Sequence, residues 1–416
     1  MTGRIQRRVL FGALYMSEGA PIGFLWWALP TKLRAAGVSV EDITALTSVL
    51  VFPWVLKFLW APLIDTLRSK RWTLRGWILS SQFMMGAALI PLMFLNFHVD
   101  FTIIYPLLIL HAVAAATQDV SVDALCIASV PEDERGAING WMQAGMLAGR
   151  SSFGGGALML GQLVDDRVVI AILIGVVWCS SGLLLISKEV RGPDAGRWSM
   201  RERWLDIAAR LKRAFSLRST LLGLLFAAIG GAAFEAVGAV AGPYLIDRGF
   251  SSEEVGFFFA TPVILGMIGG AVLGGYLSDR IGRVRSVGTF LAVLVANVFI
   301  LAMADSVLGE DARGILMGLL GLLYFCIGLF TAASYALFMD ITDPRLGATQ
   351  FSAFMGATNG CESWSAFAVG RLVTSFGYPA AFGAMGVVSL ASLPVLYGIQ
   401  RTISSKRSAD RAIARE

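Results

Sequence analysis

Residues 249–255 read GFSSEEV, and residues 37–43 read GVSVEDI. This similarity is one of three that recur at nearly the same distance along the chain. LIDTLRSKR (63–71) matches LSDRIGRVR (277–285), and RGAINGWM (135–142) matches LGATQFSA (346–353), so the three offsets are 212, 214 and 211 residues. Near-equal offsets predict a duplicated chain, whose two halves repeat one fold in the same order and place a binding site between them at the midplane.

The composition indicates that this duplicated chain lies in a membrane. Of its 416 residues, 56% are hydrophobic and 15% are charged, whereas soluble domains carry about 25% charged residues. A transmembrane helix needs about 20 predominantly apolar residues. Stretches of this kind lie at 9–31, 43–64, 76–96, 101–129, 137–163, 167–187, 219–246, 255–278, 285–304, 313–340, 348–371 and 379–400. We therefore expect an all-α membrane protein with twelve transmembrane helices in two pseudo-symmetric six-helix bundles.

The longest polar segment separates the two predicted bundles. Residues 1–187 form the expected N-terminal bundle, 219–400 the C-terminal bundle, and 401–416 a basic tail. The linker 188–218 contains WLDIAARLKRAF, a pattern typical of an amphipathic helix that lies in the membrane interface.

The distribution of Lys and Arg predicts the orientation. If the N-terminus is cytoplasmic, the cytoplasmic segments hold 26 of the 34 basic residues and the opposite loops hold six. Cytoplasmic loops of membrane proteins are enriched in Lys and Arg, so we expect both termini in the cytoplasm. The remaining two basic residues, Lys57 and Arg150, lie inside spans.

Other sequence signals exclude several kinds of site. The net charge of +5 is small and gives no indication of a nucleic-acid partner. The four cysteines are scattered, and the two histidines, His98 and His111, are too far apart for a metal motif. We expect no cofactor and no metal, and a monomer whose partners are the lipid bilayer, a small-molecule substrate and protons.

Polar groups inside the spans are the candidate site residues, because an ionisable side chain at that depth costs about 3 kcal/mol and is a functional hypothesis by default. Those expected to bind substrate or protons are Glu18, Lys57, Gln118, Asp119, Gln143, Arg150, Glu235, Asn359 and Glu362. The three glutamates lie near mid-depth, where each either carries the coupled proton or, as a neutral group, hydrogen-bonds a neighbouring helix.

The two basic residues inside spans leave alternatives open. Arg150, in GMLAGRSSFGGG (145–156), needs either an anionic substrate group or a carboxylate such as Glu18 or Glu235. The glycines that follow it permit close helix packing or a bend. Lys57 either extends to the inner interface or pairs with an acid on the fourth span.

The fourth span carries two aspartates one turn apart on one face. Asp119 and Gln118 lie deeper and are candidates for a cavity, whereas Asp123 lies nearer the cytoplasm and is placed to meet Arg68. Two like charges one turn apart repel each other, so we expect at least one aspartate to be paired or protonated.

The stretch GYLSDRIGRVR (275–285) closely resembles the cytoplasmic loop signature of the major facilitator superfamily. APLIDTLRSKR (61–71) is a degenerate first copy. The resemblance implies a conformational latch, in which contacts between charged side chains and helix dipoles stabilise one of two conformations. The alternative is that these basic residues only anchor the loop on the cytoplasmic side. The expected gating residues are Asp65, Arg68, Asp123, Asp279, Arg280 and Arg283.

Two further stretches, FPWVLKFLWAPLIDTL (52–67) and ATQDVSVDALCIASVPEDERGAING (116–140), resemble the group that contains AmpG-type muropeptide permeases, siderophore-uptake permeases and acetyl-CoA transporters. The resemblance covers most of the N-terminal half. It implies uptake of a bulky polar solute across the inner membrane with the proton gradient. AmpG-type permeases commonly carry two more helices than the twelve expected here, which keeps the siderophore branch open.

The expected function is therefore secondary active transport by alternating access. A membrane enzyme would need a nucleophile–base or metal constellation, and the carboxylates are instead spread over four spans. A sensor that binds ligand without moving it would share the sequence pattern and differ only in function.

Overall fold

The computed structural model describes residues 3–67, 72–95, 101–131, 134–187, 200–308, 312–342 and 347–413, and within these ranges every regular element is helical. The chain divides into two compact units. Unit 1 comprises Met1–Arg203 and Leu245–Thr261, and unit 2 comprises Trp204–Tyr244 and Pro262–Glu416. The segment Leu245–Thr261 thus belongs to unit 1, although the sequence repeat assigns it to the second half.

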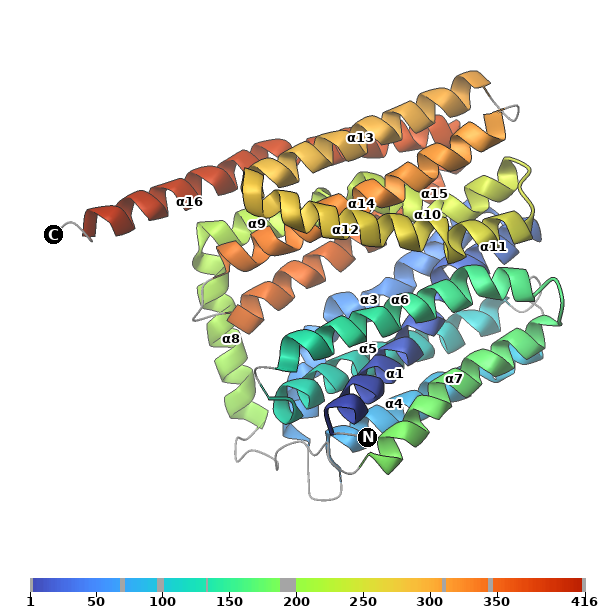
Figure 1. Cartoon of the computed structure of the whole chain (residues 1–416), viewed down its shortest axis with the longest axis horizontal. Helices are drawn as coiled ribbons and strands as arrows, with labels where there is room; N and C mark the ends of the chain where they lie inside the picture. The colour runs from blue at the N-terminus through green and yellow to red at the C-terminus, as the bar shows by residue number, and fades with distance from the viewer. Residues whose placement is uncertain are drawn as a thin grey trace. The chain divides into compact units, whose positions relative to one another are not determined.

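Unit 1 contains the helices of the N-terminal half, which Figure 1 draws in blue to green. Its elements are α1 (Gly3–Gly23), the π-helix η1 (Phe24–Ala28), α2 (Leu29–Ala35), α3 (Val40–Thr66), α4 (Leu74–Leu89), the 3-10 helix η2 (Pro91–Met93), α5 (Phe101–Ser129), α6 (Arg135–Leu160) and α7 (Asp166–Ile186), with α11 (Ser252–Ala260) from the returning segment. The first predicted span is therefore α1, η1 and α2 in continuous succession.

Unit 2 contains the helices of the C-terminal half. They are α9 (Arg218–Ile229), α10 (Ala232–Asp247), α12 (Pro262–Ile281), α13 (Arg283–Leu308), α14 (Arg313–Ile341), α15 (Gly347–Leu390) and α16 (Leu393–Ile413). α8 (Met200–Ser216) contains the segment predicted to be amphipathic, and its place in the membrane interface stays a prediction. α15 is bent at Gly377, whose φ of 81° suits glycine, between the eleventh and twelfth predicted spans.

Within the described residues, nine helical stretches are long and apolar enough to cross a membrane. One of them, Gln350–Ile403, includes the bend at Gly377 and coincides with two predicted spans. α3 and α6 coincide with the predicted spans 43–64 and 137–163 but are not among the nine. The chain is thus a multi-pass helical membrane protein, and the exact number of twelve spans stays a prediction.

Glycines bring α1 and α6 into close contact, and Figure 1 shows these two helices side by side. A Cβ atom added at Gly149 would lie 2.6 Å from the backbone nitrogen of Ala20, and one at Gly19 would overlap the carbonyl of Met146. Small residues four apart are typical of helix pairs that associate in membranes through close backbone approach. α6 continues without a break through 154–156, and the structure supports the close-packing alternative there, because a Cβ atom added at Gly155 would overlap the carbonyl of Gly256.

The seventh predicted span is broken between α9 and α10. Gly230 and Gly231 separate the two helices, and the Ser389 hydroxyl bridges the gap. It donates to the Gly230 carbonyl (3.0 Å) and accepts from the Ala233 backbone N–H (2.8 Å). Backbone groups freed inside a membrane need partners of this kind. Ser389, on α15, thus stabilises an interrupted helix in unit 2.

The segment Leu245–Thr261 is held in unit 1 by polar and aromatic contacts. Arg34 Nε pairs with Asp247 Oδ1 at 2.6 Å, and the Trp27 and Phe259 rings stack with centroids 5.0 Å apart. The segment also contains the capping box of α11, in which Ser251 and Glu254 exchange hydrogen bonds. These contacts explain why the repeat unit GFSSEEV packs with unit 1.

Candidate functional site

Three acidic side chains and one lysine meet inside unit 1. Glu18 comes from α1, Lys57 from α3, and Asp119 and Asp123 from α5. Glu18 is only 2% exposed and Asp119 only 7%. A single lysine therefore serves three carboxylates in a largely enclosed region, and the group carries a net negative charge when all four side chains are ionised.

Lys57 forms an ion pair with Asp119. Its Nζ lies 2.5 Å from Asp119 Oδ2, and the lysine side chain is 29% exposed. Of the two alternatives for Lys57, the structure has the pair with an acid on the fourth span and not the extension to the interface. Asp119 is therefore the paired member of the two aspartates.

Glu18 lies beside this pair with one oxygen unsatisfied. The indole Nε1 of Trp54 donates to Glu18 Oε1 at a long 3.4 Å, whereas Glu18 Oε2 is buried without a hydrogen-bond partner. Trp54 and Lys57 are three residues apart on α3 and hence on one face. A buried carboxylate oxygen that lacks a donor is costly, and a proton on the carboxyl would convert it into a donor.

Asp123 has a partner that the sequence did not suggest. The Tyr15 hydroxyl donates to Asp123 Oδ1 at 2.5 Å. The predicted partner, Arg68, lies outside the described residues, so the contact between Asp123 and Arg68 stays a prediction. Tyr15 precedes Glu18 by three residues on α1, so the two side chains share a helix face. This spacing is the sequence signal that could have placed Tyr15 in the acidic group.

Gln118 takes part in helix packing. Its Nε2 donates to the Leu14 carbonyl (3.1 Å) and to Ser17 Oγ (3.4 Å), and Ser17 Oγ also accepts from Gln82 (3.1 Å). We expected Gln118 beside Asp119 in a cavity, but consecutive helical residues point about 100° apart. Gln118 is fully buried between helices, and a role in binding stays a prediction.

Arg150 on α6 contacts an aromatic ring. Its guanidinium carbon lies 5.9 Å from the centroid of the Trp27 ring, a cation–π contact. Within the described part of unit 1 no carboxylate pairs with Arg150, and Glu18, one of its two predicted partners, contacts Trp54 instead. Gln143, predicted to share its face, is exposed.

The predicted site residues of unit 2 are partly buried. Glu235 lies in the first turn of α10, just after the helix break, and Asn359 and Glu362 lie on α15. The carboxylates of Glu235 and Glu362 both act electrostatically on the buried Cys361 thiol. The structure therefore brings these two glutamates to one region of unit 2. Within the described residues, no cluster of His, Cys, Asp or Glu could hold a metal ion.

The predicted gating residues of the second half form contacts at the start of α13. Arg283 pairs with Asp279 at 2.6 Å and with Asp340 of α14 at 3.5 Å, and Arg280 lies over the Tyr276 ring at 4.3 Å. In the first half, Asp65 lies on α3, but its side chain is outside the described part of the structure, as is the whole of Arg68. A gating role for these residues stays a prediction.

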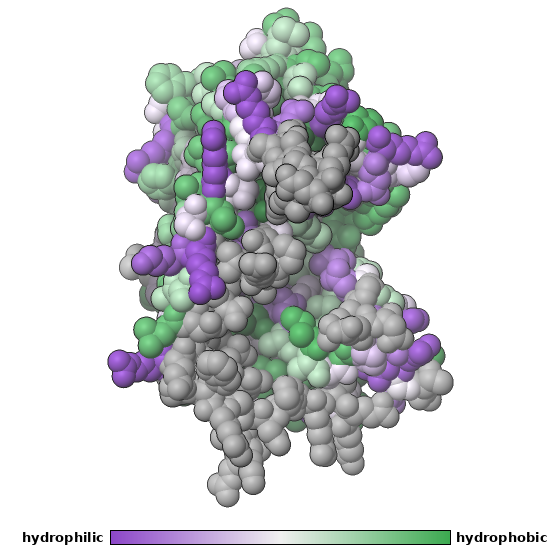
Figure 2. All heavy atoms as spheres, turned by 90° about the vertical axis from the view of Figure 1, so that its left-hand side faces the viewer, coloured by the Kyte–Doolittle hydropathy of each residue, from purple (hydrophilic) through white to green (hydrophobic). Residues whose placement is uncertain are grey.

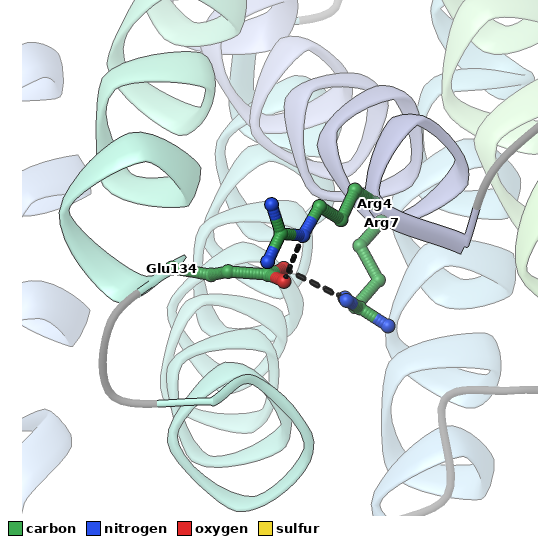
Figure 3. Close-up of polar contacts among 3 residues, drawn as sticks. All are labelled: Arg4, Arg7 and Glu134. Atoms are coloured by element: carbon green, nitrogen blue, oxygen red, sulfur yellow. Dashed lines mark hydrogen bonds and ion pairs between the residues drawn. The ribbon is translucent and has the colours of Figure 1, made fainter.

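A further ion-pair group, not predicted from the sequence, joins the first turns of α1 and α6. Figure 3 shows the Arg4 and Arg7 side chains both directed at Glu134, the residue that precedes α6. Arg4 Nε and Arg7 Nη2 each lie 2.8 Å from a Glu134 oxygen. The hydrogen bond from Arg7, followed by the charges of Arg7 and Arg4, holds the pKa of the Glu134 carboxyl below its usual value.

The family is decided by a profile described as Major Facilitator Superfamily, which matches residues 11–369 and 238–413. The chain belongs to this superfamily. Its fold agrees, because the structures of nucleoside transporter NupG and of a D-xylose–proton symporter superpose with TM-scores of 0.73 and 0.70 at 11% and 13% identity. These superpositions cover 96% and 94% of this chain, and 100% and 96% of the compared chains.

The relatives by sequence confirm the resemblance to AmpG-type permeases. A putative transporter AmpG 4 of Rickettsia conorii is 22% identical over 393 residues, covering 91% of this chain and 93% of the relative. The anhydromuropeptide permease of Escherichia coli K12 is 25% identical over 422 residues, covering 98% and 83%. The resemblance thus extends beyond the N-terminal half. This superfamily member is a transporter and not an enzyme, as predicted.

Figure 2 looks onto the helix ends at the left of Figure 1, where hydrophilic side chains are prominent among hydrophobic ones. Hydrophilic helix ends suit contact with water and lipid headgroups, as expected of a multi-pass membrane protein.

Proposed function

We propose that this superfamily transporter is a proton-coupled importer of the inner membrane for a bulky, partly anionic solute of the muropeptide class. The observation that carries the proposal is the group of three carboxylates with one lysine in unit 1. Lys57 neutralises Asp119 at 2.5 Å, and Glu18 Oε2 is buried without a partner. Such a group is stabilised by one added proton, which is what a proton symporter needs.

The substrate class rests on the relatives and on Arg150. A relative that aligns with 98% of this chain is named anhydromuropeptide permease. Arg150, which has a tryptophan ring and no carboxylate beside it in the described part of unit 1, supplies a cation for an anionic group of the solute. Trp27, itself buried and stacked on Phe259, positions the Arg150 guanidinium through the cation–π contact.

Uptake into proteoliposomes tests the proposal. The purified protein is reconstituted, an outside-acidic pH gradient is imposed, and entry of radiolabelled anhydromuropeptide is followed with and without a protonophore. We expect accumulation that the protonophore abolishes. Uptake that does not depend on the pH gradient would contradict proton coupling. Binding without uptake or counterflow would identify a sensor.

The same assay separates the substrate classes of the related permeases. A ferric siderophore and acetyl-CoA serve as competing unlabelled solutes in excess over the labelled anhydromuropeptide. We expect competition from unlabelled anhydromuropeptide alone. Transport of the siderophore or of acetyl-CoA in its place would assign the chain to one of those branches.

A further inference from the structure

The acidic group of unit 1 is ordered along one direction. On α1 the residues run from Glu18 to Tyr15, towards the N-terminus, and on α5 from Asp119 to Asp123, towards the C-terminus. α1 and α5 run in opposite directions here, because Arg7 on α1 meets Glu134, which follows α5. Both progressions therefore lead to the end of unit 1 marked by the Arg4, Arg7 and Glu134 ion pairs.

The polar contacts follow this direction as three successive pairs. Trp54 of α3 contacts Glu18 of α1, Lys57 of α3 contacts Asp119 of α5, and Tyr15 of α1 contacts Asp123 of α5. At a rise of 1.5 Å per residue, Tyr15 lies about 4.5 Å beyond Glu18 and Asp123 about 6 Å beyond Asp119 along their helices. Each pair joins two different helices, so the three pairs tie α1, α3 and α5 together.

Exposure changes in the same direction. Glu18 and Asp119 are buried, whereas Asp123 is partly exposed. The groups that face Asp123 are Tyr15 and, farther along the same helix, Glu18 from α1, Lys57 from α3 and Asp119 on its own helix. Asp123 is therefore the carboxylate of the group that lies nearest to this end of unit 1 and is the most exposed of the three.

We propose that Asp123, positioned by Tyr15, is the exit site for the transported proton. The proposal rests on the proton coupling proposed above. The O–H bond of the upstream carboxyl at Glu18 or Asp119 breaks, an O–H bond forms on Asp123, and water at the end of unit 1 then takes the proton. No electrons are transferred. The Tyr15 hydroxyl keeps its own proton and donates a hydrogen bond that favours the ionised form of Asp123, which promotes release.

Infrared titration of the purified protein in lipid nanodiscs tests the exit site without any substrate. Asp123→Asn is expected to remove one titrating carboxyl band and so to identify it. Tyr15→Phe is expected to move that band to a higher wavenumber and its titration to higher pH by about one pH unit, because a hydrogen bond to the charged form is lost. An unchanged band and midpoint in Tyr15→Phe would overturn the proposal.

The chain offers a matched control for the loss of a tyrosine–aspartate hydrogen bond. In unit 2 the Tyr244 hydroxyl donates to the buried Asp305 at 3.1 Å. Tyr244→Phe removes a contact of the same chemistry away from the acidic group, and it is expected to leave the Asp123 band and its midpoint unchanged. A shift equal to that of Tyr15→Phe would mean that the effect is general and would also overturn the proposal.

Transport of anhydromuropeptide separates this proposal from the proposed function. Asp123→Asn is expected to lose gradient-driven accumulation and to retain exchange of internal for external solute, which needs no net proton release and shows that the variant is folded. Tyr15→Phe is expected to lose uptake at acidic internal pH and to recover as the internal pH is raised. If the wild type ignores the gradient, both proposals fail. If the wild type responds to the gradient and both variants behave as the wild type does, only the proposed exit site fails.

Discussion

At the scale of single residues, the position of Lys57 decides how the acidic group of unit 1 is tolerated. It is the one cation in contact with these carboxylates in the described structure, and it neutralises Asp119 directly. Removing one partner of a buried ion pair leaves an uncompensated charge, and this costs more than removing both partners.

The first prediction concerns this pair. Lys57→Met is expected to destabilise the protein by about 3 kcal/mol, because Asp119 is left buried and unpaired. The double variant Lys57→Met, Asp119→Leu is expected to recover most of that loss, since no charge remains. The thermal unfolding midpoint in detergent measures both. A double variant no more stable than the single one would show that the pair is not the source of the cost.

Arg150 gives the second prediction at this scale. Arg150→Gln is expected to raise the KM for anhydromuropeptide about tenfold, because an arginine–anion contact worth about 1.4 kcal/mol is lost. Arg150→Lys should recover part of the affinity. Arg371, whose guanidinium lies 4.1 Å from the Phe367 ring in unit 2, offers the matched control Arg371→Gln. Equal effects at Arg150 and Arg371 would contradict a substrate contact.

At the scale of helices, close pairing of α1 with α6 organises unit 1. Glycines at Gly19 and Gly149 allow the two backbones to touch, and the Arg4, Arg7 and Glu134 ion pairs tie the starts of the same helices. The pKa of Glu134 is lowered by these arginines, so the ion pairs stabilise the folded protein at pH values where the carboxyl is ionised.

The third prediction follows from the sign of that pKa shift. A carboxyl with a lowered pKa contributes stability that is present above its usual value of 4.5 and is lost as the pH falls below it. The wild type is therefore expected to unfold at a higher temperature than Glu134→Gln at pH 7, and this difference should shrink below about pH 4.5. Asp165→Asn, at the start of α7, is the control. A difference independent of pH would refute the electrostatic explanation.

At the scale of the whole molecule, the sequence predicts a duplicated chain and the structure has two compact units. The division between these units does not follow the sequence repeat. Leu245–Thr261 packs in unit 1 through Arg34, Asp247 and the Trp27–Phe259 stack. The contact partners of a segment depend on its position in space, and a repeat in sequence does not record them.

The fourth prediction concerns orientation. Single cysteines at the exposed positions Gln6 and Arg401, in a Cys179→Ser background, are expected to react with a membrane-impermeant maleimide from the cytoplasmic side only. A cysteine at the exposed Arg167 should react from the opposite side only. The 26 to 6 distribution of basic residues is the physical reason. Labelling of Gln6→Cys and Arg167→Cys from one side would invalidate this topology.

The sequence by itself determined the class of the molecule and most of its helices. Low charge, long apolar runs and the repeated offsets require a duplicated helical membrane protein, because backbone groups in lipid can be satisfied only within helices or closed barrels. The loop GYLSDRIGRVR and the stretches around Lys57 and Asp119 also identified the superfamily and the AmpG-type relatives. The same reasoning selected Glu18, Lys57 and Asp119, since ionisable residues at mid-span are expensive wherever they occur.

Only the tertiary structure decided which of these residues meet. Helical periodicity gives the face of each side chain but neither the rotation of one helix against another nor the partner across the gap. Tyr15 as the partner of Asp123, Gln118 in helix packing, and Ser389 across the break after α9 all depend on helix placement. Arg150 beside Trp27, without a carboxylate in the described part of unit 1, depends on it equally.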